Sequence, residues 1–276
     1  MEDDLEFALR LADLADWVTL AGYQDHRPLE VATKPDLTPV TNLDREVELA
    51  LRQHLLDARP GDAVVGEEFG PGGFGAAAGR WILDPIDNTK GYVRRSPVFA
   101  TLIAYERDGV LQVGVCSAPA LRRRWWAGRG LGAYRSDGLL RMRPFPGLAR
   151  YQDAGDRIGV STVADLAHAQ LNHSDFLAWD DHRLLDRFMD LARRCGRRRG
   201  PGDFWGLLEV AEGIADLAVE AEPVGLHDLA ALQVILEEAG GRLTDLQGQA
   251  PAEGDGPVVA SNGLLHDQAL AALGIG

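Results

Sequence analysis

The segment from Trp81 to Thr89 constrains the fold of this chain more than any other. Its first three residues, Trp-Ile-Leu, are bulky and apolar, and they run directly into Asp84-Pro85, a dipeptide that favours a turn. A short apolar run that meets a turn signal predicts a buried strand ending at Asp84. The chain then reads Ile-Asp-Asn-Thr, which enters a candidate helix at Thr89.

The pattern of apolar residues changes on either side of this segment. Before it, helical spacing predicts amphipathic helices over residues 4–22 and from Thr41 or Asn42 to the Arg59-Pro60 pair. After it, short apolar segments joined by turn residues predict an antiparallel meander with strands at 98–105, 111–117 and 124–127. We expect residues 1–145 to form an α+β half that carries the acidic motifs discussed below.

Residues 146–276 alternate between strand and helix patterns, which predicts helices layered on a sheet. We expect this second half to complete an active-site cleft. The predicted strands are 158–161, 215–219, 241–244 and 258–260, and the predicted helices are 182–195, 203–212, 227–239 and 263–273.

Charge and cysteine content exclude several classes of protein. Asp and Glu number 42 against 28 Lys and Arg, for a formal charge of −14, so the surface should repel nucleic acid and anionic membranes. Two distant cysteines, Cys116 and Cys195, do not predict a disulfide framework. No signal peptide or membrane span is apparent, and we expect a cytoplasmic protein.

Three acidic clusters stand at the expected ends of strands or helices: Glu67-Glu68, Asp84 with Asp87, and Asp228. Carboxylate oxygens beside a helix start that can hold an anion describe a magnesium site, where cations stabilise the oxygens of a phosphoryl transfer. Taken singly, each cluster could be a solvated turn, a turn former or a helix start. Their combination and order favour the metal site.

The same clusters carry a resemblance to a known family. Gly66-Glu-Glu, Trp81-Ile-Leu-Asp-Pro-Ile-Asp-x-Thr89 and the run from Asp228 to Gly241 resemble the signature motifs of the inositol-monophosphatase superfamily. Further segments are similar to the histidinol-phosphate phosphatases of actinobacteria; these are 33–41, 66–70, 113–121, 124–127 and 261–267. The resemblance covers nearly the whole chain.

This resemblance implies an α+β fold, a layered αβαβα sandwich of the inositol-monophosphatase and fructose-bisphosphatase type. It implies a phosphomonoesterase that uses Mg²⁺, with Mn²⁺ as a substitute, acts on a small phosphorylated metabolite and forms a homodimer. The implied metal ligands are Glu67, Asp84, Asp87, Asp228 and the carbonyl of Ile86. Glu67 and Thr89 would act in catalysis, with Thr89 orienting the attacking water, and the amides of Asn88 and Thr89 would hold the phosphate.

Three residues depart from the family pattern. Asn42 stands where the resemblance implies an Asp that helps Thr89 activate water, and a carboxamide cannot take a proton. Asp44 follows two residues later, about 200° around a helix, so direct substitution is not expected. Asn88 replaces a Gly, and Asn tolerates the left-handed conformation that the turn needs. His227 replaces a Trp, either as a packing residue or as a substrate contact.

Recognition of the leaving alcohol is expected near the start of the helix at Asp203. Its carboxylate could attract the ammonium group of histidinol or could cap the helix. A substrate-contacting Glu of the family corresponds to either Glu220 or Glu222, and we assign Glu222 to this role. Two arginine runs, 122–124 and 193–199, are expected to be solvated faces or to pair with acidic patches of a second subunit.

Three functions are compatible with these motifs. The first is hydrolysis of L-histidinol phosphate in histidine synthesis. The second is hydrolysis of a sugar, inositol or nucleoside phosphate by a paralogue. The third is a catalytically impaired protein that binds a phosphorylated ligand, which the loss of a carboxylate at Asn42 would explain.

Overall fold

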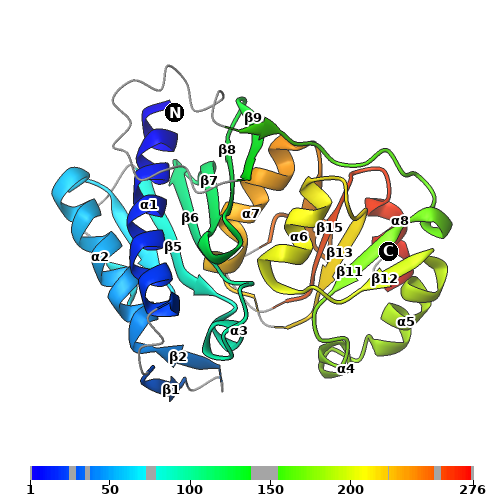
Figure 1. Cartoon of the computed structure of the whole chain (residues 1–276). Helices are drawn as coiled ribbons and strands as arrows, with labels where there is room; N and C mark the ends of the chain where they lie inside the picture. The colour runs from blue at the N-terminus through cyan, green and yellow to red at the C-terminus, as the bar shows by residue number, and fades with distance from the viewer. Residues whose placement is uncertain are drawn as a thin grey trace. The chain divides into compact units, whose positions relative to one another are not determined.

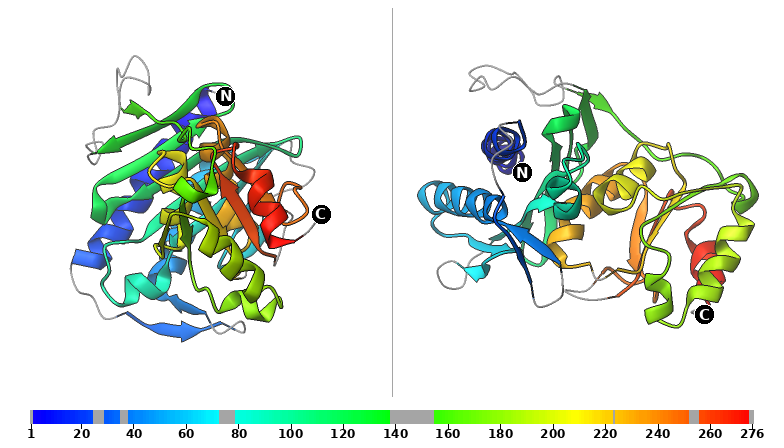
Figure 2. Two further views of the ribbon diagram at one scale, coloured as in Figure 1. Left: turned by 90° about the vertical axis from the view of Figure 1, so that its right-hand side faces the viewer. Right: turned by 60° about the horizontal axis from the view of Figure 1, so that its bottom comes forward.

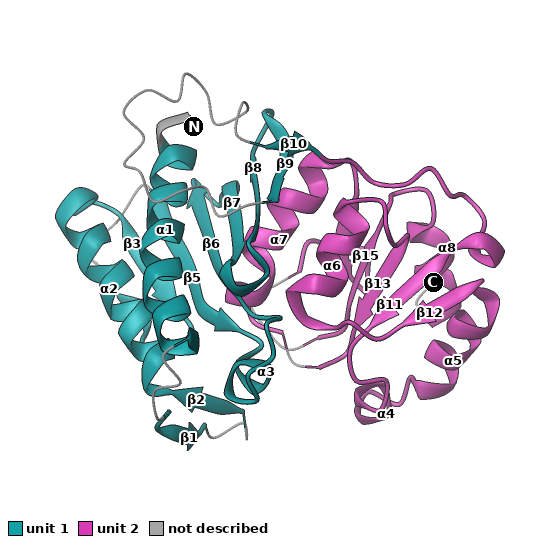
Figure 3. Ribbon diagram, in the orientation of Figure 1, with its two compact units in different colours: residues 1–157 teal, residues 158–276 magenta. Residues whose placement is uncertain are grey.

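The computed structural model describes residues 2–24, 29–34, 38–72, 79–137, 155–222, 224–251 and 256–274. The chain divides into two compact units, Met1–Arg157 and Ile158–Gly276 (Figure 3). The boundary expected between residues 145 and 146 lies outside the described residues. Among the helices that are described, none is both long and apolar enough to cross a membrane.

Unit 1 is built on an eight-stranded sheet with the order β10-β9-β8-β7-β6-β5-β3-β4. Strands β5 to β9 pair with their neighbours in chain order and antiparallel, which confirms the predicted meander, whereas β3 pairs parallel with β5. The strands are β3 (Ala63–Gly66), β4 (Gly70–Gly72), β5 (Gly79–Asp87), β6 (Ala100–Arg107), β7 (Val110–Ala118), β8 (Arg123–Gly128), β9 (Gly132–Asp137) and β10 (Asp156–Arg157).

Two long helices, α1 (Glu2–Gln24) and α2 (Asn42–Ala58), lie side by side on one face of this sheet (Figures 1 and 2). Helix α1 contacts β6 and β7, and α2 contacts β5, because their apolar stripes bury against side chains such as Trp81 and Trp126. Thr41 caps α2 and Arg59 ends it, as the sequence predicts. A short ladder of β1 (Val31–Thr33) and β2 (Pro39–Thr41) precedes α2.

Strand β5 runs through the predicted turn instead of ending at Asp84. It continues to Asp87, and its pairing with β6 shifts register between Asp84 and Asp87. Pro85 has no N–H to donate to a ladder and is therefore tolerated at such an irregularity. Its carbonyl accepts a hydrogen bond of 2.8 Å from the hydroxyl of Thr101 on β6. The predicted turn is thus a local bulge within the strand.

Unit 2 contains a five-stranded sheet with the order β12-β11-β13-β15-β14. Helices α6 (Asp203–Ala211) and α7 (Leu226–Glu238) contact each other, and both contact this sheet (Figure 1). Helices α5 (Leu185–Arg194) and α8 (His266–Leu273) pack with apolar side chains of β11, β13 and β15 in a separate core cluster. The strands are β11 (Gln170–His173), β12 (Arg197–Arg199), β13 (Leu217–Glu220), β14 (Arg242–Asp245) and β15 (Val258–Ser261).

The strand predicted at 158–161 is wrong, and β11, β12 and the short helix α4 (Ala178–Asp181) were not predicted. The segment 158–161 is held by individual hydrogen bonds instead of a strand ladder. The Ser161 hydroxyl donates to Asp216 and accepts a bond of 2.9 Å from the Asn262 amide. The other predicted elements of unit 2 appear with ends shifted by up to three residues, and both cysteines are buried thiols.

Candidate active site

The end of β5 presents two carboxylates, Asp84 and Asp87. Asp84 is 1% exposed, and Asp87 is partly exposed. The backbone N–H of Asn88 donates to Asp87 Oδ1 over 3.0 Å, so the backbone that follows the strand orients this carboxylate. The bulge at Pro85 therefore brings two carboxylates of one strand to the start of the next helix, α3 (Thr89–Val93).

Asn88 forms the turn between strand and helix in the left-handed conformation, with φ 62° and ψ 51°. The expected tolerance of Asn for this geometry is confirmed. Its side-chain oxygen accepts from the N–H of Gly91 over 2.8 Å, and its amide donates to the carbonyl of Val98 over 3.0 Å. A β carbon at Gly91 would lie 2.7 Å from the Asn88 amide nitrogen, so the close approach requires glycine there.

The hydroxyl of Thr89 is within hydrogen-bond distance of two acceptors. It lies 3.1 Å from Asp44 Oδ1 and 2.9 Å from the carbonyl oxygen of Ile86. Asp44 is 0% exposed, and its other oxygen accepts from the backbone N–H of Thr41 over 2.8 Å in the capping box of α2. Burial raises the pKa of Asp44, and the charge of Glu67 raises it further, against the hydrogen bonds from Thr41 and Thr89.

Asn42 does not face Thr89, and its assignment as the residue beside Thr89 is wrong. Its side-chain oxygen accepts from the N–H of Glu30 over 3.1 Å, and its amide donates to Glu46 over 3.1 Å. Because positions 42 and 44 point about 200° apart on a helix, only one of them can face the site, and that one is Asp44. Asp44 was not expected to take the place of the missing carboxylate, although the spacing Thr41-x-x-Asp44 is a capping-box signal.

The turn after β3 carries Glu67. Its backbone N–H donates to the carbonyl of Leu83 on β5 over 3.1 Å, which ties the turn to the strand that bears Asp84. Lys34 Nζ lies 2.6 Å from a carboxylate oxygen of both Glu67 and Glu68. Burial alone would lower the pKa of Lys34, but the hydrogen bonds and charges of the two glutamates outweigh it and raise the pKa.

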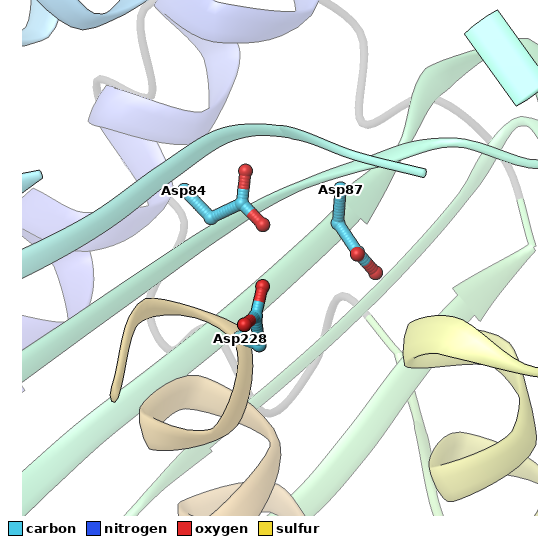
Figure 4. Close-up of side chains that lie close together, drawn as sticks. All are labelled: Asp84, Asp87 and Asp228. Carbon is cyan, nitrogen blue, oxygen red and sulfur yellow. The ribbon is translucent and has the colours of Figure 1, made fainter. Parts of the chain in front are cut away.

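Asp84, Asp87 and Asp228 each offer one carboxylate oxygen within 4.8 Å of the other two (Figure 4). Asp228 stands in the first turn of α7 and accepts a bond of 2.5 Å from the N–H of Gly225. Three carboxylates at such separations repel one another unless a cation lies among them. The donor set, hard oxygen atoms only, fits a divalent cation such as Mg²⁺.

Unit 2 contains a second group of carboxylates. Glu220, at the end of β13, is 4% exposed, and burial raises its pKa to about 8, helped by the charges of Asp203 and Glu222 and opposed by hydrogen bonds from Ser174. Asp203 does not cap α6, because the cap position is Gly202. Asp203 itself has a positive φ of 47°, an uncommon geometry that often accompanies functional sites.

His227 lies against its own turn. Its Nε2 is 3.6 Å from Asp228 Oδ2, and a β carbon at Gly225 would lie 2.4 Å from the imidazole. This close packing agrees with the packing interpretation. A contact of His227 with substrate stays a prediction, as does the choice of Glu222 over the more deeply buried Glu220.

Comparisons with known proteins show which family the chain is similar to. The pattern of the Inositol monophosphatase family matches residues 1–274. A histidinol-phosphatase of Mycobacterium tuberculosis is 50% identical over 276 residues, covering 99% of both chains. A histidinol-phosphatase of Streptomyces coelicolor is 44% identical over 272 residues, covering 97% of this chain and 96% of its own.

Solved structures share the fold. An inositol monophosphatase of Zymomonas mobilis superposes with a TM-score of 0.80 at 29% identity, covering 99% of this chain and 98% of its own. An IMPase of Thermotoga maritima gives a TM-score of 0.80 at 26% identity, covering 98% and 96%. The expected α+β fold, the layered αβαβα sandwich, is confirmed.

Proposed function

Because the chain belongs to the inositol monophosphatase family and is a phosphomonoesterase, we propose that it hydrolyses L-histidinol phosphate to L-histidinol and phosphate with Mg²⁺. The observation that carries the proposal is the convergence of the carboxylates Asp84, Asp87 and Asp228 within 4.8 Å. The two actinobacterial relatives, named histidinol-phosphatases, support the choice of substrate. Histidine biosynthesis is the corresponding role.

Five groups would hold the cation or cations: the carboxylates of Glu67, Asp84, Asp87 and Asp228 and the carbonyl of Ile86. Mn²⁺ should substitute, since it accepts the same oxygen ligands. When bound, the cation polarises the phosphoryl oxygens and makes a coordinated water more acidic. The protein's part is to hold these ligands in place, and the N–H of Asn88 does so for Asp87.

Thr89 and Asp44 would handle the proton of the attacking water. When the Thr89 hydroxyl donates to Asp44 over 3.1 Å, its oxygen lone pairs are available to accept from a water on the other side. Asp44 can then take up a proton through the hydroxyl, and its raised pKa favours proton uptake. The amides of Asn88 and Thr89 would hold the phosphate, which requires the Asn88 N–H to be shared with Asp87.

The leaving alcohol would be recognised by its positive charge. Asp203 and Glu222 lie close enough to Glu220 for their charges to add to the rise that burial causes in its pKa. A group of carboxylates favours an ammonium ligand over a neutral sugar or inositol. L-histidinol carries an ammonium group, so these residues support histidinol phosphate over the uncharged alternatives.

Asp44 also bears on the catalytically impaired alternative. That alternative depended on the absence of a carboxylate at Asn42, whereas the structure supplies one at Asp44, hydrogen-bonded to Thr89. We therefore propose a working enzyme. We also propose, from the family resemblance, that it acts as a homodimer in the cytoplasm; sedimentation equilibrium at micromolar concentration tests the dimer.

A phosphate-release screen tests the proposed function. Histidinol phosphate, inositol phosphates, sugar phosphates and nucleotides are compared with and without Mg²⁺. We expect the highest kcat/KM on histidinol phosphate and no turnover after removal of divalent cations. A higher kcat/KM on an uncharged ester would favour the paralogue, and undiminished turnover in a chelator would contradict the metal site.

A further inference from the structure

The turn that carries Glu67 is held by hydrogen bonds to a buried carboxylate of α2. Glu48 is 0% exposed. Its side chain accepts hydrogen bonds from the backbone N–H of Glu68 over 2.7 Å and of Phe69 over 3.3 Å. It also accepts from Arg52 Nε over 2.7 Å. Glu48 therefore satisfies two backbone amides of the turn immediately after Glu67, and its charge is balanced by Arg52.

The first and last residues of this turn, Gly66 and Gly70, lie close to Glu48 and Arg52 respectively. A β carbon at Gly66 would lie 2.1 Å from Glu48 Oε1, so the turn can reach the carboxylate only with glycine at this position. At the other end, the guanidinium of Arg52 donates to the carbonyl of Gly70. Glu48 thus bonds to the middle of the turn from Gly66 to Gly70, and Arg52 bonds to its last residue.

Asp44, Glu48 and Arg52 follow one another at intervals of four residues and so share one face of α2. This face contacts two separate parts of the site. Asp44 bonds to Thr89 at the start of α3, and Glu48 bonds to the turn of Glu67. A single rigid helix therefore fixes the position of the proposed water-orienting hydroxyl relative to the proposed metal ligand.

We infer that Glu48 is a positioning residue for Glu67, setting the turn so that the Glu67 carboxylate can bind the cation. The inference rests on the proposed metal-dependent function. Glu48 itself points at backbone amides and Arg52, so its effect on the cation passes through the turn. Groups that orient a metal ligand in this way typically change metal affinity or activity by ~10–100-fold when they are replaced.

The test is Mg²⁺ binding to Glu48→Gln, measured by titration calorimetry in the presence of inorganic phosphate. The replacement keeps the size of the side chain and removes one acceptor oxygen and the charge. We expect a Kd for Mg²⁺ about 10-fold or more above wild type, with kcat at saturating Mg²⁺ reduced much less than kcat/KM at limiting Mg²⁺.

Asp4→Asn is the matched control, because Asp4 is also a buried carboxylate of unit 1 and pairs with Arg59 and Arg107. It should lower the Tm but leave the Kd for Mg²⁺ unchanged.

Equal Kd values for wild type and Glu48→Gln would overturn the inference while leaving the proposed function intact. If wild-type protein binds no Mg²⁺, the proposed function fails as well. If Glu48→Gln does not fold, Glu48→Asp, which keeps the charge but shortens the reach, is measured against the same criterion.

Discussion

Three carboxylates of unit 1 and Glu220 of unit 2 differ in how they are held. In unit 1, Asp44, Glu48 and Asp87 each accept hydrogen bonds from backbone N–H groups of a neighbouring turn or cap. In unit 2, Glu220 has one buried oxygen, Oε1, with no hydrogen-bond partner among the described residues. Backbone hydrogen bonds fix the orientation of a carboxylate in advance, whereas burial with incomplete hydrogen bonding raises the pKa of Glu220 to about 8, so that Glu220 holds a proton near neutral pH.

The largest effect should come from the unit 1 group. Asp87→Asn removes one of three converging carboxylates, and the loss of several kcal/mol of charge stabilisation corresponds to a fall in kcat/KM of about 10³-fold or more. Phosphate release and calorimetric Mg²⁺ binding should both decline. Asp57→Asn, at an exposed carboxylate of α2, is the control and should change neither.

Asp44→Asn tests the proton acceptor. Removal of a general base typically costs ~10²–10⁴-fold in kcat, and the Tm should change little because a carboxamide oxygen can still accept from Thr41. Asn42→Asp is the matched variant two residues away, and we expect its kcat to stay within about twofold of wild type, since Asn42 faces Glu46 and Glu30. A tenfold gain from Asn42→Asp would instead mean that Asn42 faces the reaction and that Asp44 has been given the wrong role.

Asp203→Asn tests the unit 2 group. A hydrogen bond to a charged group contributes ~1.5–3 kcal/mol, so the KM for histidinol phosphate should rise about 10-fold or more. The KM for an uncharged sugar phosphate should be nearly unchanged. Equal losses on both esters would show that Asp203 supports the turn before α6 and does not bind the ammonium group.

Glu220→Gln should give the smallest effect, and on stability instead of rate. The pKa of Glu220 is about 8 in the folded protein against an ordinary value of 4.5. Because the folded state binds this proton more tightly than the unfolded state, the stability it contributes is complete below pH 4.5 and is lost as the pH rises to 8. Glutamine does not titrate, so the Tm of the variant relative to wild type should be higher at pH 8.5 than at pH 5.

The difference in Tm between Glu220→Gln and wild type is measured by thermal unfolding at pH 5 and at pH 8.5. We expect a relative gain of roughly 2 °C or more. Asp190→Asn, at an exposed carboxylate of the same unit that pairs with Arg193, should show no such pH-dependent gain. If Glu220→Gln destabilises the protein equally at both pH values, Glu220 is a structural hydrogen-bonding group and the contrast between the two units is lost.

The sequence by itself determined the family, the fold class and the order of most elements. The run from Trp81 to Thr89 predicted strand β5, the start of α3 and the carboxylates of Asp84 and Asp87. It could do so because apolar runs, Pro and Asp carry their conformational preferences locally. The left-handed turn at Asn88 followed for the same reason. The motif order identified the resemblance without any knowledge of distances.

Only the tertiary structure decided which residues of α2 contact Thr89 and the turn of Glu67. Asn42 and Asp44 both lie in the first turn of the helix, and the rotation of that turn depends on how α2 packs on β5. In the sequence, nothing distinguishes Glu48 from an ordinary helix residue. Two of its hydrogen-bond partners are backbone amides 20 and 21 residues away. A backbone amide has no side-chain signature, so a residue that binds one leaves no pattern in the sequence and becomes visible only in the fold.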